Sequence, residues 1–420
     1  KDLETSDRGG NEWRGGKGAL GVRKGPDPNP IYDTFLAAGE QSGQGITDDL
    51  NGFNPEGLSR LDATISNGRR NSSATTFLNP ALKRNNIKLQ KNILVEKIFL
   101  ENDRAVGIEV SEKGQKYRIE AEKEIILSAG ALNSPQILML SGIGPADHLR
   151  NIGSNVFHDL PGVGQNLQDH ATVSISWECL KEFENHKIDR PINKMMAGIK
   201  WIINRKGLAA SNHFEAGGLI RGNDNVKYPN LQYHFGPTGF DYIGGKFKLS
   251  QAFTLQLDLL RPHSRGYLKL KSLNPKDSPE IKLNYFKDPR DIKELTEGVK
   301  KMRELVSQPV FDKFRGKEIS PGSEIQSDSE IEQAIRLNTI TDYHQCGTCA
   351  MGTDVNSVVD SEMRVKGINS LRIVDASVLP NVVSGNIGAP VMMIAARAAD
   401  WILGKNQLEP LKANFKFDQI

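Results

Sequence analysis

Apolar residues recur at helical spacing in four segments of the chain. These segments are residues 31–44, 191–204, 291–307 and 390–403. The first ends near Gly43 and the last near Gly404, and glycine commonly follows the last turn of a helix. We therefore expect four helices at these places.

Short apolar runs separated by polar turns follow a different, strand-like period. They extend from residue 87 to residue 110, where the polar turn 101–104 divides them, and recur at 117–122 and 230–235. Such runs predict strands joined by turns. The chain therefore combines both kinds of element, which indicates an α/β protein. Its 420 residues are too many for one ordinary domain, so we expect two.

Residues 124–135 join an apolar strand to a helix through a turn of small residues. The turn contains Ala129 and Gly130, and we expect the helix to begin at Pro135, where a missing backbone N–H costs little. A strand, a glycine turn and a helix N-terminus together let a phosphate group approach backbone N–H groups. This is the first candidate for a cofactor site.

Composition and charge exclude several classes of partner. The net charge is only +3, with 54 basic and 51 acidic residues spread along the chain, so we expect no nucleic-acid partner. Three cysteines form no disulfide framework, which indicates a reducing compartment and a cytoplasmic location. No uninterrupted apolar run is long enough to predict a transmembrane segment.

Several blocks resemble signatures of the glucose–methanol–choline (GMC) oxidoreductase family, in the family's order. They are residues 130–144 (GALNSPQILMLSGIG), 160–170 (LPGVGQNLQDH), 343–352 (YHQCGTCAMG), 374–380 (VDASVLP) and 384–390 (SGNIGAP). Residues 210–218 (ASNHFEAGG) are similar to members that oxidise choline. Together the blocks extend from residue 130 to residue 390.

The resemblance implies a Rossmann-like FAD-binding domain and a substrate-binding domain with a mainly antiparallel sheet flanked by helices. We expect the FAD domain at 84–170 and 341–410, and the substrate domain at 20–83 and 171–340. Family members open with an apolar strand followed by a G-x-G-x-x-G turn that binds the FAD pyrophosphate, and this sequence has no such strand-and-turn unit. Since it begins at Lys1 rather than Met, we interpret it as a fragment whose dinucleotide-binding unit lies upstream.

The implied reaction is the oxidation of a primary alcohol, with choline to betaine aldehyde as the expected conversion. The flavin carries the redox step, and the protein supplies a base and charge stabilisation. His344 is the predicted base, because imidazole accepts a proton near neutral pH. Asn386 is the predicted second catalytic residue, whose amide holds the substrate oxygen as negative charge develops.

The resemblance also implies the residues around the cofactor and the substrate. The FAD contacts are expected at Val95, Ala129, Gly130, Asp375, Ala376, Asn386 and Pro390. For a quaternary ammonium substrate, which favours aromatic faces and a carboxylate, we expect Phe214, Glu215, Tyr233 and His234. Asp375 also fits a simple turn-capping role.

Several alternatives stay open on the sequence alone. Cys346 and Cys349 have the spacing of a zinc or thiol-redox motif, but no second cysteine pair exists, so we expect no metal. The chain is also compatible with a GMC enzyme for another alcohol, with an oxidase that uses O₂ rather than a quinone-type acceptor, and with a truncated relative that only binds partners. A homo-oligomer and a peripheral position at the inner face of a membrane are further alternatives.

Overall fold

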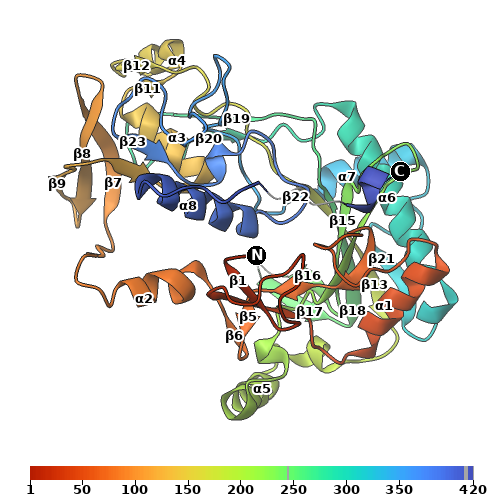
Figure 1. The fold of residues 1–420 in the computed structure, drawn as a ribbon. Helices are drawn as coiled ribbons and strands as arrows, with labels where there is room; N and C mark the ends of the chain where they lie inside the picture. The colour runs from red at the N-terminus through yellow and green to blue at the C-terminus, as the bar shows by residue number, and fades with distance from the viewer. Residues whose placement is uncertain (244–245, 411–414, 420) are drawn as a thin grey trace.

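The computed structural model describes residues 1–243, 246–410 and 415–419 (Figure 1). Its largest element is a seven-stranded sheet, and every neighbouring pair of strands in it is antiparallel. In spatial order the strands are β21 (Arg315–Ser320), β13 (Ala171–Cys179), β18 (Ala252–Leu259), β15 (Leu231–Gly236), β14 (Ala216–Ile220) and β3 (Gly57–Arg60), with β22 (Ile340–Thr341) also paired to β13. The expectation of a mainly antiparallel sheet is confirmed.

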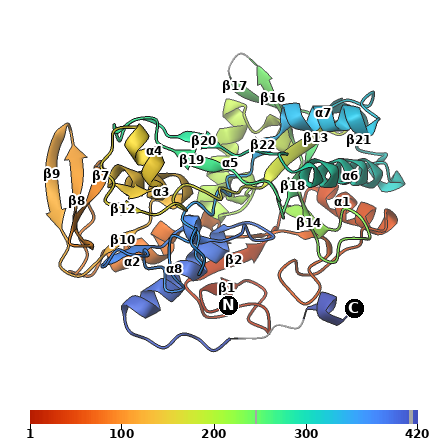
Figure 2. The same ribbon diagram turned by 90° about the horizontal axis from the view of Figure 1, so that it is seen from above.

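Three helices cover one face of this sheet. They are α1 (Pro30–Gln41), α6 (Pro289–Val306) and α7 (Asp328–Asn338), and Figure 2 shows them gathered at the sheet. Alternate strand residues point toward them, among them Val173, Tyr233 and Leu257, which belong to one buried apolar cluster with the inner face of α6. The opposite face of the sheet is polar and carries Thr172, Gln232, His234 and Asp258.

A second group of helices and strands lies beside the sheet (Figure 1). Its own apolar cluster joins α3 to a parallel strand pair and a three-stranded antiparallel sheet. The elements are β7 (Leu94–Glu101), β8 (Arg104–Glu112), β9 (Gln115–Glu120), β10 (Ile125–Leu127), α3 (Gly130–Leu140), β11 (Ile143–Gly144), α4 (Ala146–Asn151), β12 (His158–Asp159), β23 (Leu371–Ile373) and α8 (Gly388–Ile402). The predicted domain borders stay a prediction.

Smaller elements fill the remaining connections. The strands are β1 (Glu4–Ser6), β2 (Leu20–Lys24), β4 (Asp62–Ala63), β5 (Ile65–Ser66), β6 (Arg69–Arg70), β16 (Gly239–Ile243), β17 (Lys246–Ser250), β19 (Tyr267–Lys269) and β20 (Glu280–Lys282). The helices are α2 (Asn79–Ala81), α5 (Pro191–Asn204) and the single turns η1 (Ala74–Leu78), η2 (Glu184–Lys187), η3 (Leu208–Ala210), η4 (Pro309–Phe311), η5 (Ala376–Val378) and η6 (Lys416–Gln419). Among the described residues, no helix is both long and apolar enough to cross a membrane.

The four helices expected from apolar spacing are all present, as α1, α5, α6 and α8. The expected start of α3 was wrong, because that helix begins at Gly130 and Pro135 lies inside it. Proline has no N–H to bond the carbonyl four residues back, which belongs to Ala131. That carbonyl instead accepts a hydrogen bond from the Thr348 hydroxyl at 2.5 Å. A contact far along the chain therefore replaces the missing helical bond.

Candidate active site

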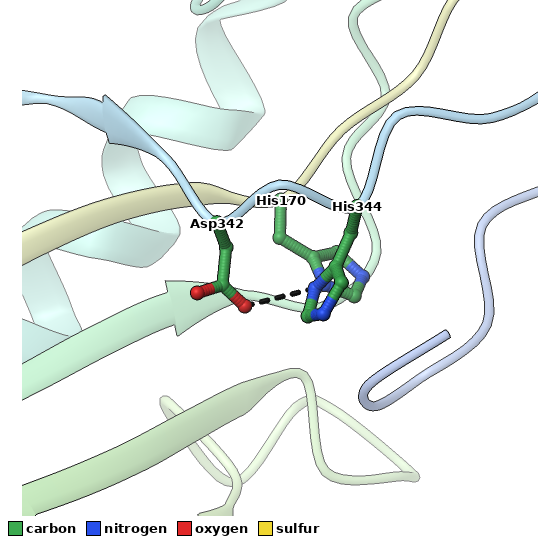
Figure 3. A group of neighbouring side chains, drawn as sticks. All are labelled: His170, Asp342 and His344. Carbon is green, nitrogen blue, oxygen red and sulfur yellow. Dashed lines mark hydrogen bonds and ion pairs between the residues drawn. The ribbon is translucent and has the colours of Figure 1, made fainter. Parts of the chain in front are cut away.

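His344 lies just after β22, on a loop that passes over the polar face of the sheet. Its neighbour Tyr343 adopts a left-handed backbone conformation (φ +60°), which is unusual for a residue with a side chain. Figure 3 shows the result, with the side chains of Asp342 and His344 turned toward each other from the same loop. The Asp342 carboxylate lies 2.8 Å from His344 Nδ1.

The buried carboxylate of Asp169 holds this loop in place. It accepts hydrogen bonds from the His344 N–H at 2.9 Å, the Tyr285 hydroxyl at 2.6 Å and the Gln345 amide at 3.0 Å, and also from the Thr341 hydroxyl. Burial raises the pKa of Asp169, although these donors oppose the shift. Four donors on one carboxylate fix the backbone that carries His344.

A second histidine completes the surroundings of His344. His170 lies beside it, with the two Nδ1 atoms 3.0 Å apart (Figure 3). His170 Nε2 lies 3.0 Å from the Val383 carbonyl, which can only accept, so the proton of neutral His170 is on Nε2 and its Nδ1 accepts. In neutral His344 the proton is therefore on Nδ1, facing Asp342 and His170, and Nε2 is the acceptor.

Asn386 lies on the other side of His344, in the loop before α8. Its Nδ2 is 3.5 Å from His344 Nε2, and its Oδ1 accepts a hydrogen bond from Gln232 Nε2 at 3.0 Å. Because Gln232 donates to the Asn386 side-chain oxygen, the NH₂ group of Asn386 is the end that faces His344. The two predicted catalytic residues are thus brought together, from segments that are distant in sequence.

His234 shares the polar face of the sheet with Gln232. Its Nδ1 is 2.9 Å from Asp258, and its Nε2 is 2.9 Å from Gln232 Nε2. Burial by itself lowers the pKa of His234, but the charge and hydrogen bond of Asp258 outweigh it and raise the pKa. The Phe214 ring packs against the His234 ring, with centroids 6.2 Å apart. Two of the four predicted substrate residues, His234 and Phe214, therefore adjoin the site.

The other two predicted substrate residues are not brought to His344. Tyr233 is fully buried among the apolar side chains beneath the helices, because it alternates with Gln232 and His234 along β15. Glu215 is also buried, and its carboxylate accepts a hydrogen bond from the Asp27 N–H at 2.5 Å. Among the described residues, no contact joins either side chain to His344 or Asn386.

The predicted cofactor residues gather around the parallel pair of β10 and β23, at the ends where both strands stop. Asp375 follows β23, and its Oδ2 accepts hydrogen bonds from the Gly130 N–H at 2.9 Å and the Ser134 hydroxyl at 2.6 Å. Its Oδ1 accepts two more from the backbone and hydroxyl of Ser377. Asp375 therefore caps η5, as the alternative reading expected, and also fixes the turn at Gly130.

The remaining predicted cofactor residues lie on neighbouring elements. Ala129 precedes α3, and its N–H donates to the Ser134 hydroxyl. Ala376 is buried in η5, Pro390 is in the first turn of α8, and Val95 is half-buried on β7 against the α3 cluster. A Cβ atom added at Gly130, Gly385 or Gly388 would meet no atom within 4 Å. There is therefore free space beside the backbone at these three positions.

Sequence reasoning missed four residues of this site. They are Asp169, His170, Gln232 and Asp342. A signal existed for the first two, because Asp169 and His170 end the block 160–170 that resembles the family. Gln232 lies one position from the predicted Tyr233, on the other face of the strand. Asp342 immediately precedes the block that contains His344.

Cys346 and Cys349 are buried free thiols. Burial raises the pKa of Cys346 to about 12 and that of Cys349 well above its ordinary value. Two groups of the described residues have metal-ligand spacing, and both consist of histidine and aspartate around Asp342. Neither group includes a cysteine, and the expectation that the cysteine motif holds no metal stays a prediction.

This arrangement defines an oxidoreductase of known class. Two family models, both described as GMC oxidoreductase, match residues 4–172 and 262–395. Mitochondrial choline dehydrogenase from Homo sapiens is 43% identical over 95% of this chain and 68% of its own length. Oxygen-dependent choline dehydrogenase from Brucella ovis is 42% identical over 97% of this chain and 74% of its own.

Solved structures agree with this assignment. Pyridoxine 4-oxidase from Mesorbium loti has a TM-score of 0.84 and 26% identity, and the match covers 97% of this chain and 76% of that one. A formate oxidase has a TM-score of 0.87 at 24% identity over 96% and 76%, which shows the shared fold. The chain belongs to the GMC oxidoreductase family. It is therefore an FAD-dependent enzyme that acts on CH–OH donors.

We expect His170 to remain neutral from about pH 8 down to about pH 5. Burial, and after it the charge of His344, lowers the pKa of His170 to about 4. The unfolded chain binds this proton more readily, so His170 should make folding less favourable as the pH falls from about 6.5 to about 4. The ring nitrogen shifts of labelled histidine, followed by NMR against pH, measure this directly. A His170→Asn variant identifies the resonance, and titration near pH 6.5 would contradict the expectation.

Proposed function

We propose that this enzyme oxidises choline to betaine aldehyde, with His344 as the base and Asn386 as the donor to the substrate oxygen. The observation that carries the proposal is the 3.5 Å separation of His344 Nε2 and Asn386 Nδ2. It puts a lone pair and an N–H donor side by side, and an alcohol oxygen that loses its proton needs both. The choline dehydrogenases among its relatives support the choice of substrate.

His344 receives the hydroxyl proton of the alcohol at Nε2. Its Nδ1 proton faces Asp342 at 2.8 Å, which keeps the ring in the tautomer that leaves Nε2 free. When Nε2 takes up the proton, the ring becomes positively charged, and the Asp342 carboxylate stabilises that charge. Neutral His170 accepts from the same nitrogen and adds no opposing charge.

Asn386 acts on the substrate oxygen. Gln232 holds its carbonyl oxygen, so the NH₂ group is directed toward His344. As the proton leaves the alcohol, negative charge grows on the oxygen, and a donor that is already oriented stabilises it without reorganisation. An asparagine side chain cannot itself take the proton, so the two roles stay separate.

The charge around the site favours a cationic substrate. Asp258 and Asp342 are two carboxylates close to the polar face, where the pKa of His170 is lowered to about 4 and that of His234 is raised. Even a protonated His234 leaves one negative charge uncompensated while His344 is neutral. The half-buried Phe214 ring beside His234 adds an aromatic surface for a trimethylammonium group.

The chain fits FAD through its open backbone segments. Gly130 lies at the N-terminus of α3 with open space beside it, and Gly385 and Gly388 leave space beside Asn386. The N–H groups of Ala129 and Gly130 themselves already donate to Ser134 and Asp375. Asp375 and Ala376 support the first of these segments, while Val95 and Pro390 border the adenine and flavin ends in our proposal. FAD, when bound, accepts the hydride that leaves the alcohol carbon.

Choline should bleach the visible absorbance of the FAD-loaded enzyme in the absence of oxygen. The uncharged isostere 3,3-dimethylbutan-1-ol is the matched control, and we expect it to require at least about tenfold more substrate, because it lacks the charge that the carboxylates attract. Bleaching by other primary alcohols but not by choline would contradict the substrate and leave the chemistry in place. Hydrogen peroxide formed after oxygen is readmitted would show that O₂ is an acceptor.

Replacing His344 by alanine should lower kcat/KM by about 10²- to 10⁴-fold, which is the usual contribution of a positioned base. Asn386→Ala should lower kcat by about 10²- to 10³-fold, through the lost donor to the oxyanion. Tyr343→Phe is the control, because its side chain is largely exposed and adjoins His344 in sequence. Rapid-reaction measurement of flavin reduction gives both values. Unchanged reduction in His344→Ala would remove the base assignment.

Asp342→Asn should lower kcat by about 10- to 100-fold, which corresponds to the loss of one charge-assisted hydrogen bond. Asp342→Glu, which keeps the charge, should lower kcat less. An equal loss of kcat in both variants would mean that Asp342 acts only on the shape of the loop.

A further inference from the structure

Helix α5 turns its apolar side toward solvent. Six large apolar residues follow the spacing of one helix face: Ile192, Met195, Met196, Ile199, Ile202 and Ile203. Each is between 42% and 77% exposed, and none of the 14 residues of α5, all of them described, is buried. An ordinary surface helix buries such a face against its own protein. Among the described residues, nothing packs over this face of α5 enough to bury it.

The opposite side of α5 fixes this orientation. Trp201 points toward the protein, and its indole N–H donates to the Gly68 carbonyl at 2.6 Å. The guanidinium groups of Arg69 and Arg205 lie over the same ring, 5.6 and 4.0 Å from its centroid. Arg205 ends the helix in a left-handed conformation. The outward apolar face is therefore held by a specific attachment, and Figure 1 draws α5 at the lower edge of the molecule.

Cations predominate on and directly beside α5. Residues 190–207 contain Arg190, Lys194, Lys200, Arg205 and Lys206, and no aspartate or glutamate. The nearest acidic residues are Asp189, which precedes this segment, and Glu184, which lines a pocket with Lys200 and Lys206. An apolar stripe flanked mainly by cations is the pattern of a helix that lies in the boundary of an anionic lipid bilayer.

We propose that α5 is a membrane-docking helix that lies flat on an anionic lipid surface, with its apolar face among the acyl chains and its cations at the headgroups. This keeps the enzyme peripheral, since α5 has only 14 residues and does not span a bilayer. The proposal concerns a surface apart from His344 and does not depend on the identity of the alcohol.

Charge argues against a second copy of the chain as the occupant. A two-fold contact through α5 would bring two groups of five cations together. An anionic lipid surface instead supplies the opposite charge and also accepts an apolar stripe.

Vesicle co-sedimentation of the FAD-loaded enzyme tests the proposal. The enzyme should bind vesicles that contain phosphatidylglycerol and should bind phosphatidylcholine vesicles at least about tenfold more weakly, with the difference reduced by salt. Ile199→Glu combined with Ile203→Glu should weaken binding to the anionic vesicles by about tenfold or more. Leu337→Glu is the matched control, because Leu337 on α7 is equally exposed and should leave binding unchanged.

A second variant tests the charges and leaves the apolar face intact. Lys194→Glu combined with Lys206→Glu should weaken binding to anionic vesicles, and both variants should retain flavin reduction by the substrate. The proposal is overturned if the unmodified enzyme binds neither vesicle type, or if the isoleucine variant binds as the unmodified enzyme does. It is also overturned if that variant converts a dimer to a monomer in size-exclusion chromatography without any change in vesicle binding.

Discussion

Each strand of the seven-stranded sheet must send successive side chains to opposite faces, and this constraint creates the polar surface on which the loops of His344 and Asn386 meet. Along β15, Tyr233 packs beneath the helices while Gln232 and His234 reach the polar face. The same alternation on β13 and β18 brings Thr172 and Asp258 to that face, where they are hydrogen bonded at 2.7 Å. The apolar face of the sheet packs against α1 and α6. Loops from distant parts of the sequence meet on its polar face.

Two buried carboxylates fix the two loop regions on either side of the site. Asp169 fixes the loop of His344, and Asp375 fixes the turn at Gly130. The bond from Thr348 to the carbonyl of Ala131 joins the two regions, because Thr348 lies on the His344 loop and Ala131 in the first turn of α3. A carboxylate that accepts several hydrogen bonds is costly to leave without donors, so these contacts make a single arrangement strongly preferred.

Much of this could be predicted from sequence, where local pattern was sufficient. The helices α5 and α6 follow directly from apolar spacing, and His344 and Asn386 stand in blocks with a family likeness. The sequence pattern does not show which face of β15 is polar. It therefore predicts Tyr233 in the site, whereas Gln232 is the residue that contacts Asn386. Asp342, His170 and Asp169 matter through long-range contacts, and Pro135 is tolerated inside α3 only because Thr348 supplies a donor. The outward face of α5 has the same spacing as an inward one, so only the structure distinguishes them.

The contacts of Asp375 have a consequence for the cost of binding at the neighbouring turn. Its carboxylate accepts hydrogen bonds from the Gly130 N–H and the Ser134 hydroxyl, and two more from Ser377. A turn that the protein's own contacts fix in this way loses little conformational entropy when a ligand associates with it.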